Sequence, residues 1–151
     1  MSSLNLPKYD AKIIKTGDNY EIFDILRRKY LVLTPEEWVR QNFIHYLINH
    51  KGYPDSLMAN ETAIKLNSLT KRCDTVVYNN NLEPLAICEY KNPEIEITQE
   101  VFDQIARYNI VLKVKYLIVS NGLNHYCCLM DYNNMTYSFV EDIPDYETLK
   151  R

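Results

Sequence analysis

Alternating apolar and polar residues predict β-strands along much of this chain. Two such runs, residues 72–78 and 85–91, are joined by the turn-like segment Asn79-Asn80-Asn81-Leu82-Glu83-Pro84, and we expect them to form a β-hairpin. Further strands are predicted, in chain order, over residues 11–15, 20–24, 115–120, 126–131 and 135–140. Residues 30–33 fit a short strand or an extended segment, and residues 59–64 fit a strand or a helix, of which we favour the strand.

Two segments carry the pattern of amphipathic helices. The first is predicted to begin with Thr34 as its N-cap, with Pro35 in the first helical position and Glu37 completing a capping box. It should end at Gly52, and its apolar stripe is formed by Val39, Phe43, Tyr46 and Leu47. The second helix is predicted from Thr98 or Gln99 to Leu112.

The order of these elements predicts an α/β fold. A strand at 85–91, a helix at about 98–112 and a strand at 115–120 form a βαβ crossover, which makes the two strands parallel. Because the flanking hairpins are antiparallel, we expect a mixed β-sheet flanked by helices.

Length and composition fit one globular domain. The chain has 151 residues, of which 46% are hydrophobic and 25% charged. We divide it into an N-terminal hairpin extension over 1–33, a core over 34–140 and a C-terminal tail over 141–151. It has no run of 18 apolar residues and no basic-apolar N-terminal pattern, so we expect neither a membrane span nor a secretory signal, and a cytoplasmic location.

The cysteine spacing indicates no zinc site. None of the four forms a Cys-x-x-Cys pair, which favours reduced cysteines in a cytosolic core over a disulfide or a metal site. Cys127 and Cys128 are adjacent in a predicted strand, so their side chains should point to opposite faces of the sheet. His45 and His50 are five apart on the first helix and face different ways.

Three residues of the central hairpin carry the chemical signal. A symmetric loop centred between Asn81 and Leu82 places Asp74 directly opposite Glu89 on one face of the hairpin. Like charges in that position destabilise a sheet, and a divalent cation between them would reverse the effect. Lys91 is two residues beyond Glu89 and shares its face. Two acids and a lysine at one point are typical of a metal-dependent phosphodiesterase.

This pattern resembles the PD-(D/E)XK nuclease superfamily, whose core motif is an acid on one strand and Glu-x-Lys on the next. The chain looks most like the N-terminal nuclease domain of type I restriction enzyme R proteins, so the expected fold is a restriction-endonuclease-like sheet. The resemblance rests on Thr34-Pro35-Glu36-Glu37-Trp38-Val39-Arg40-Gln41, Cys73-Asp74, Cys88-Glu89-Tyr90-Lys91, Gln104-x-x-x-Tyr108 and Tyr116-Leu117-Ile118-Val119-Ser120-Asn121-Gly122.

The resemblance implies a role for each site residue. Asp74 and Glu89 would bind Mg²⁺ or Mn²⁺ through hard oxygen ligands, with the Tyr90 backbone carbonyl as a further ligand. Lys91 would stabilise charge on the phosphate or help to position or deprotonate the attacking water. Cys73 stands where the superfamily name has proline.

Two helical sites complete the implied set. Gln104 and Tyr108 are four apart on the second helix and match the Gln-x-x-x-Tyr motif of RecB-type nucleases, in which they support the active site. Glu37 matches the first-helix acid that reaches the site in many superfamily members, although it is equally explained as the capping-box acid. Glu36 and Glu61 are weaker candidates for the same catalytic role.

We therefore expect an Mg²⁺-dependent endonuclease domain that cleaves DNA in restriction or defence. A type I R protein also carries a DNA-translocating motor, and 151 residues cannot hold one. Expected partners are DNA and motor, methylase or specificity subunits, or a second copy in a homodimer. The net charge of −3 offers only scattered basic clusters to DNA, at 27–29, 71–72 and 113–115.

Two other readings stay open. One is a non-catalytic nucleic-acid-binding or assembly module that keeps the same fold. The other is a nuclease that acts on structured RNA, because nothing in the sequence separates DNA from RNA as the substrate.

Overall fold

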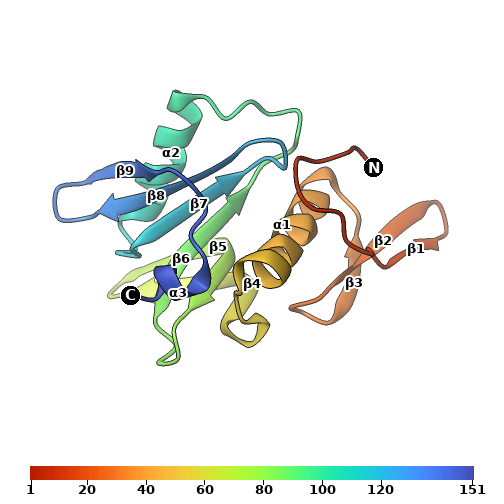
Figure 1. Cartoon of the computed structure of the whole chain (residues 1–151), viewed down its shortest axis with the longest axis horizontal. Coiled ribbons are helices and arrows are strands. Elements are labelled where there is room, and N and C mark those ends of the chain that lie inside the picture. The colour runs from red at the N-terminus through yellow and green to blue at the C-terminus, as the bar shows by residue number, and fades with distance from the viewer.

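A six-stranded sheet forms the centre of the computed structural model, which describes residues 1–151 (Figure 1). Its strands are adjacent in chain order, and only β6 and β7 are parallel. The strands are β4 (Met58–Leu66), β5 (Leu69–Tyr78), β6 (Pro84–Tyr90), β7 (Tyr116–Ser120), β8 (His125–Asp131) and β9 (Thr136–Val140). Helix α2 (Gln99–Ile110) makes the crossover between β6 and β7. The predicted mixed α/β sheet is confirmed.

Helix α1 (Pro35–Lys51) has the predicted ends. The Thr34 hydroxyl accepts a hydrogen bond from the Glu37 amide at 3.0 Å, and Gly52 closes the helix in the left-handed conformation with φ of 71°. The capping box is only half formed, because the Glu37 carboxylate accepts hydrogen bonds from Arg40 and Gln41. The prediction that Glu37 completes this box was therefore wrong.

The sheet separates two apolar clusters. One contains Val39, Phe43 and Leu47 of α1, and the other contains Phe102, Ile105 and Ile110 of α2. The adjacent residues Cys127 and Cys128 fall in different clusters, which confirms that they point to opposite faces. All four cysteines are buried free thiols. The two helices thus cover opposite faces of one sheet.

The N-terminal extension forms a sheet of its own. It consists of β1 (Ile13–Thr16), β2 (Asn19–Asp24) and β3 (Lys29–Val32), all antiparallel. This sheet lies beyond the end of the main sheet, beside α1 (Figure 1). Ile22 and Asp24 on β2 are fully buried. The small sheet therefore joins the body of the molecule through β2, and Leu4, Leu6, Ile25 and Leu26 outside its strands pack against the α1 cluster.

The segment described above as a tail packs into the core. This segment contains the last helix, α3 (Tyr146–Leu149). The chain also has one short 3₁₀ helix, η1 (Asp55–Leu57), between α1 and β4. Tyr146 and Leu149 belong to the same apolar cluster as α1, and the Tyr146 hydroxyl donates to the carbonyl of Tyr78 at 2.8 Å. No helix of the structure is long and apolar enough to cross a membrane.

The burial of α3 leads to a stability prediction. Leu149 has no exposed surface, so Leu149→Ala should lower the free energy of unfolding by about 2–5 kcal/mol. Urea unfolding followed by circular dichroism measures this change. Leu82→Ala is the matched control, because Leu82 is 69% exposed and its loss should have little effect. Equal stability of the two variants would mean that α3 contributes nothing to the core.

Candidate active site

The predicted facing carboxylates lie where the β5–β6 ladder ends. The two strands pair as Thr75↔Cys88, Val76↔Ile87 and Val77↔Ala86, with a bulge after Val77. The next positions in this register are Asp74 and Glu89. Because side chains alternate along a strand, both acids point to the face of Val76 and Ile87, which is the face covered by α2.

Beyond the last β5–β6 backbone pair, the Asp74 side chain takes the place of a backbone hydrogen-bond acceptor. Its Oδ2 atom accepts a hydrogen bond from the backbone amide of Tyr90 at 2.9 Å. A carboxylate that accepts from a backbone amide is held in one orientation. The end of the ladder therefore fixes the direction of the Asp74 carboxylate.

A cleft of about 510 Å³ opens between this strand end and α2. It brings together five of the six residues that the sequence pointed to: Asp74, Glu89, Lys91, Gln104 and Tyr108. The other residues that line it are Arg72, Tyr90, Val101, Ile105 and Asn109. Residues from β5, β6 and α2 thus converge on one cleft.

Glu89 is electrostatically the most perturbed carboxyl of the cleft. Burial and, after it, the neighbouring Asp74 carboxylate raise the pKa of Glu89 to about 9, against smaller lowering effects of Lys91 and Asn109. At neutral pH the metal-free site therefore keeps a proton on Glu89. A strongly perturbed acid in a cleft marks a candidate functional site.

Asn109 adds an unsatisfied polar atom. Its amide nitrogen donates to the Ile105 carbonyl at 2.9 Å, whereas its buried Oδ1 atom has no hydrogen-bond partner. Buried oxygens without a partner are uncommon in native structures. This oxygen belongs to a residue that lines the cleft, so the hydrogen bonding of the cleft is incomplete as it stands.

Gln104 and Tyr108 lie at the outer wall of the cleft. Both are exposed on α2, and Tyr108 keeps 49% of its surface accessible. The Lys71 ammonium lies 3.7 Å from the centre of the Tyr108 ring, a cation–π contact. Gln104 and Tyr108 can therefore contact a molecule bound in the cleft, and Lys71 lies against the Tyr108 ring.

Glu37 does not line this cleft. It is 5% exposed, and its carboxylate takes hydrogen bonds from Arg40 at 2.9 and 3.1 Å and from Gln41 at 3.0 Å. Arg27 approaches it at 3.5 Å. Glu37, the sixth predicted residue, thus belongs to an ion-pair network in the first turns of α1 and is separate from the other five.

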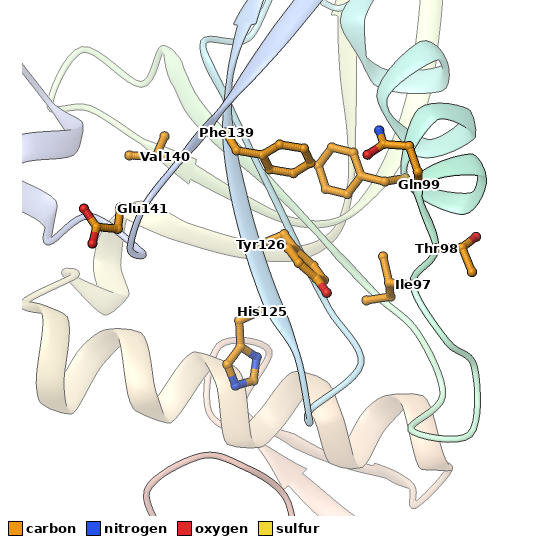
Figure 2. Close-up of a pocket in the computed structure, with 9 residues that line it drawn as sticks. Ile97, Thr98, Gln99, His125, Tyr126, Phe139, Val140 and Glu141 are labelled. Atoms are coloured by element: carbon orange, nitrogen blue, oxygen red, sulfur yellow. The ribbon is translucent and has the colours of Figure 1, made fainter.

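Another hollow of about 510 Å³ lies at the opposite end of α2. Figure 2 shows Tyr126 and Phe139 projecting from the sheet toward the helix that carries Gln99. The Phe139 ring is 4.8 Å from that of Phe102. Five of its nine lining residues are hydrophobic, and the others are Thr98, Gln99, His125 and Glu141. With one carboxylate and no lysine or arginine, this hollow lacks the acid pair and the cation found in the cleft.

The cleft offers few protein ligands for a metal. No group of three or more His, Cys, Asp or Glu side chains gathers anywhere in the chain. Asp74 and Glu89 are its only two carboxylates. Any ion held there would need backbone carbonyls, water or substrate oxygens to complete its coordination, which is common for Mg²⁺.

Comparison with known families identifies the chain. A family model described as "Type I restriction enzyme R protein N terminus (HSDR_N)" matches residues 35–144. The chain belongs to this family. The match includes all six predicted site residues and relates the domain to restriction systems.

Solved structures support the fold of this R-protein N-terminal domain. A fragment described as an HsdR subunit of a type I restriction enzyme from Vibrio vulnificus YJ016 superposes with a TM-score of 0.54 at 17% identity. The alignment covers 78% of this chain and 25% of that one, so the domain spans about a quarter of the relative's length. A comparison with curated protein sequences found no match.

Arg72 and Asn109 are cleft residues outside the predicted site set, and Arg72 was named only as part of the basic cluster 71–72. Asn109 directly follows Tyr108 of the helical motif, so its position one residue further along α2 was the available signal. Arg72 lies two residues before Asp74 on β5, but Lys71 contacts Tyr108 of α2 and Cys73 packs in the α2 cluster, so the alternation of side chains is broken between Arg72 and Asp74. The period of the strand could therefore not have identified it.

The raised pKa of Glu89 predicts a pH dependence of stability. Between pH 4.5 and about 9 the folded R-protein domain keeps a proton that the unfolded chain has released. The free energy of unfolding of the metal-free domain should therefore fall as the pH rises through this range, by up to about 1.4 kcal/mol per unit before solvent screening.

Urea unfolding at a series of pH values in EDTA tests this. Glu89→Gln should remove this part of the slope and be more stable than the wild type at pH 8. Glu100→Gln, on an exposed position of α2, is the control and should follow the wild type. A wild-type slope that survives in Glu89→Gln would place the responsible group elsewhere.

Proposed function

We propose that this R-protein N-terminal domain is an Mg²⁺- or Mn²⁺-dependent endonuclease of the PD-(D/E)XK type that hydrolyses DNA phosphodiester bonds in a restriction system. The observation that carries the proposal is the convergence of Asp74, Glu89 and Lys91 with Gln104 and Tyr108 on one cleft. Their order along the chain matches the superfamily motifs, and membership in the R-protein family is consistent with it.

The oxygen donors of the cleft suit a hard divalent cation. Asp74 and Glu89 would hold it, with the Tyr90 carbonyl as a further ligand, and the Oδ1 atom of Asn109 is a buried oxygen that lacks a partner. Bound there, the ion would orient the phosphate and offset the charge that develops during hydrolysis. Binding requires Glu89 to lose its proton, so affinity should increase with pH.

The remaining residues act on the phosphate and the water. The Lys91 ammonium lines the cleft beside the two acids and can offset negative charge on the phosphoryl oxygens. Gln104 can hydrogen-bond a phosphate oxygen or the attacking water, and Tyr108 can hold the nucleic-acid backbone at the outer wall. Addition of water to phosphorus then breaks one phosphorus–oxygen bond of the strand.

The nuclease assay tests the proposal directly. Wild-type domain should cut DNA when Mg²⁺ or Mn²⁺ is present and not in EDTA, and Lys91→Ala should lower the rate by about 100-fold or more, because it removes one charge-stabilising donor. Lys65→Ala, on the edge strand β4 away from the cleft, is the control and should cut at the wild-type rate. Mn²⁺ titration calorimetry should show loss of binding in Asp74→Asn and Glu89→Gln.

Each other outcome is informative. Cleavage of structured RNA but not of DNA would replace the substrate class. Metal binding without cleavage of either would favour a non-catalytic nucleic-acid-binding or assembly module. Full activity of Lys91→Ala, or unchanged Mn²⁺ binding by both acid variants, would contradict the proposed site.

Charge limits the affinity for DNA. The net charge is −3, and Arg72 and Lys91 are the two cations that line the cleft. Because phosphate contacts dominate DNA affinity, two or three contacts give weak binding with a log–log salt slope of about −2 to −3. Partner subunits or a second copy would supply the missing affinity through effective concentration.

A salt titration of duplex binding measures that slope. Arg72→Ala should make it shallower by about one, because one phosphate contact is lost, whereas Lys65→Ala should leave it unchanged. Fluorescence anisotropy in EDTA, where no cleavage is expected, avoids cutting of the duplex during the measurement. Tight, sequence-specific binding by the domain alone at physiological salt would contradict the expectation of dependence on partners.

A further inference from the structure

The β4–β5 ladder is interrupted at one position. The strands pair as Asn60↔Thr75 and Thr62↔Cys73, so Glu61 should face Asp74, yet these two residues are not paired. Glu61 has φ of 52°, in the left-handed region. The register is the same on both sides, so no residue has been inserted. A single residue in an unfavourable conformation opens the ladder beside the candidate catalytic acid.

Arg40 supplies a hydrogen-bond donor at this interruption. Its Nη1 atom donates to the backbone carbonyl of Asp74 at 3.0 Å and to the Glu61 carboxylate at 2.9 Å. Arg40 belongs to α1, which covers the face of the sheet opposite α2. The guanidinium therefore holds the backbone of Asp74 from the α1 face, while the carboxylate points into the cleft on the other.

The Arg40 side chain is itself held rigidly. Its Nε and Nη2 atoms donate to the two oxygens of Glu37 at 3.1 and 2.9 Å, a bidentate pair. Gln41 donates to the same carboxylate at 3.0 Å. Burial would lower the pKa of Arg40, but the hydrogen bonds and charges of Glu37 and Glu61 raise it, so the guanidinium stays charged. Arg40 is a fixed cationic anchor.

Tyr90, the second residue that bonds to Asp74, is held by a chain of buried hydrogen bonds. Tyr90, whose amide donates to the Asp74 carboxylate, has its hydroxyl on Thr75 at 2.9 Å. Thr75 donates to Asn60 at 2.6 Å, and Asn60 donates to Asp24 on β2. Asp74 is thus fixed at its carbonyl by Arg40 and at its carboxylate by Tyr90.

We propose that Arg40 is a positioning residue of the active site. The left-handed conformation of Glu61 leaves the Asp74 carbonyl without a ladder partner, and Arg40 binds this carbonyl instead. Arg40 thereby sets the direction of the carboxylate that would bind the metal. Its role as a metal-site residue rests on the proposed function. Glu37 then serves the site through Arg40 rather than by touching a metal or substrate. Arg40 does not line the cleft, so it has no direct part in the chemistry.

The first test compares two arginines that share Glu37. Arg27 pairs with Glu37 at 3.5 Å and with Asp24 at 2.6 Å, but it does not touch Asp74. Two measurements are made on Arg40→Met and Arg27→Met. One is hydrogen exchange of the Tyr90 amide in metal-free protein, relative to global unfolding. The other is the Mn²⁺ dissociation constant by calorimetry. Should Arg40→Met fail to fold, Arg40→Lys takes its place.

Arg40→Met should speed exchange of the Tyr90 amide at least tenfold beyond any change in global stability. It should also weaken Mn²⁺ binding about 10- to 100-fold, as expected when a partner behind a metal ligand is lost. Arg27→Met should lower global stability, because buried Asp24 loses its ion pair, but beyond that loss it should change neither value. Equal effects of the two variants, or no effect of Arg40→Met, would overturn the proposal.

The second test separates backbone from charge at Glu61. Glu61→Gly and Glu61→Val both remove the carboxylate, but glycine keeps the left-handed conformation readily, whereas a β-branched residue disfavours it. Mn²⁺ affinity should stay near that of the wild type in Glu61→Gly and fall at least tenfold in Glu61→Val. Equal affinities would show that the open ladder has no role.

The amide exchange distinguishes this proposal from the function on which it rests. If the wild type binds no Mn²⁺ while Arg40→Met still exposes the Tyr90 amide, the metal site fails and the anchoring of Asp74 stands. If Mn²⁺ binds and neither amide exchange nor affinity responds to Arg40→Met, the metal site stands and the positioning role fails.

Discussion

The structure depends on placing two like-charged carboxylates together beside an apolar core. Asp74 and Glu89 share the face of the sheet on which α2 packs, and each lies two residues along its strand from a buried residue of that face, Val76 and Ile87. Two ionised acids at such half-buried positions repel each other and lose solvation, so the metal-free site keeps a proton on Glu89. A folding cost retained at one cleft is characteristic of a functional site.

The two faces of the sheet divide the work of building that cleft. On one side the sheet presents the two acids and Lys91 to the cleft, and α2 presents Gln104 from across it. On the other face the polar groups are buried and bonded to one another, so Arg40 and Tyr90 can hold the strand ends without exposing a ligand. A site at the end of the β5–β6 ladder needs this support, because the pairing that would otherwise fix the backbone stops there.

Local patterns in the sequence predicted much of the fold and five cleft residues. Alternation and a symmetric loop were enough for the register that brings Asp74 beside Glu89, because a strand has a fixed period of two. Helix α1 was bounded by Thr34 and Gly52, whose capping roles act within one turn. The crossover through α2 followed from the order of elements alone, since parallel neighbours require such a connection.

The sequence by itself determined the strand periods, the helix ends and the chemical identity of the cleft. Only the tertiary structure decided how that cleft is supported. Glu37 reads as a capping-box acid, yet it binds Arg40, and Arg40 reaches Asp74 across 34 positions of the chain. The left-handed conformation of Glu61 could not be predicted from its residue type, because glycine or asparagine is the usual residue in that conformation. Such contacts arise from packing between distant elements, which no local period encodes.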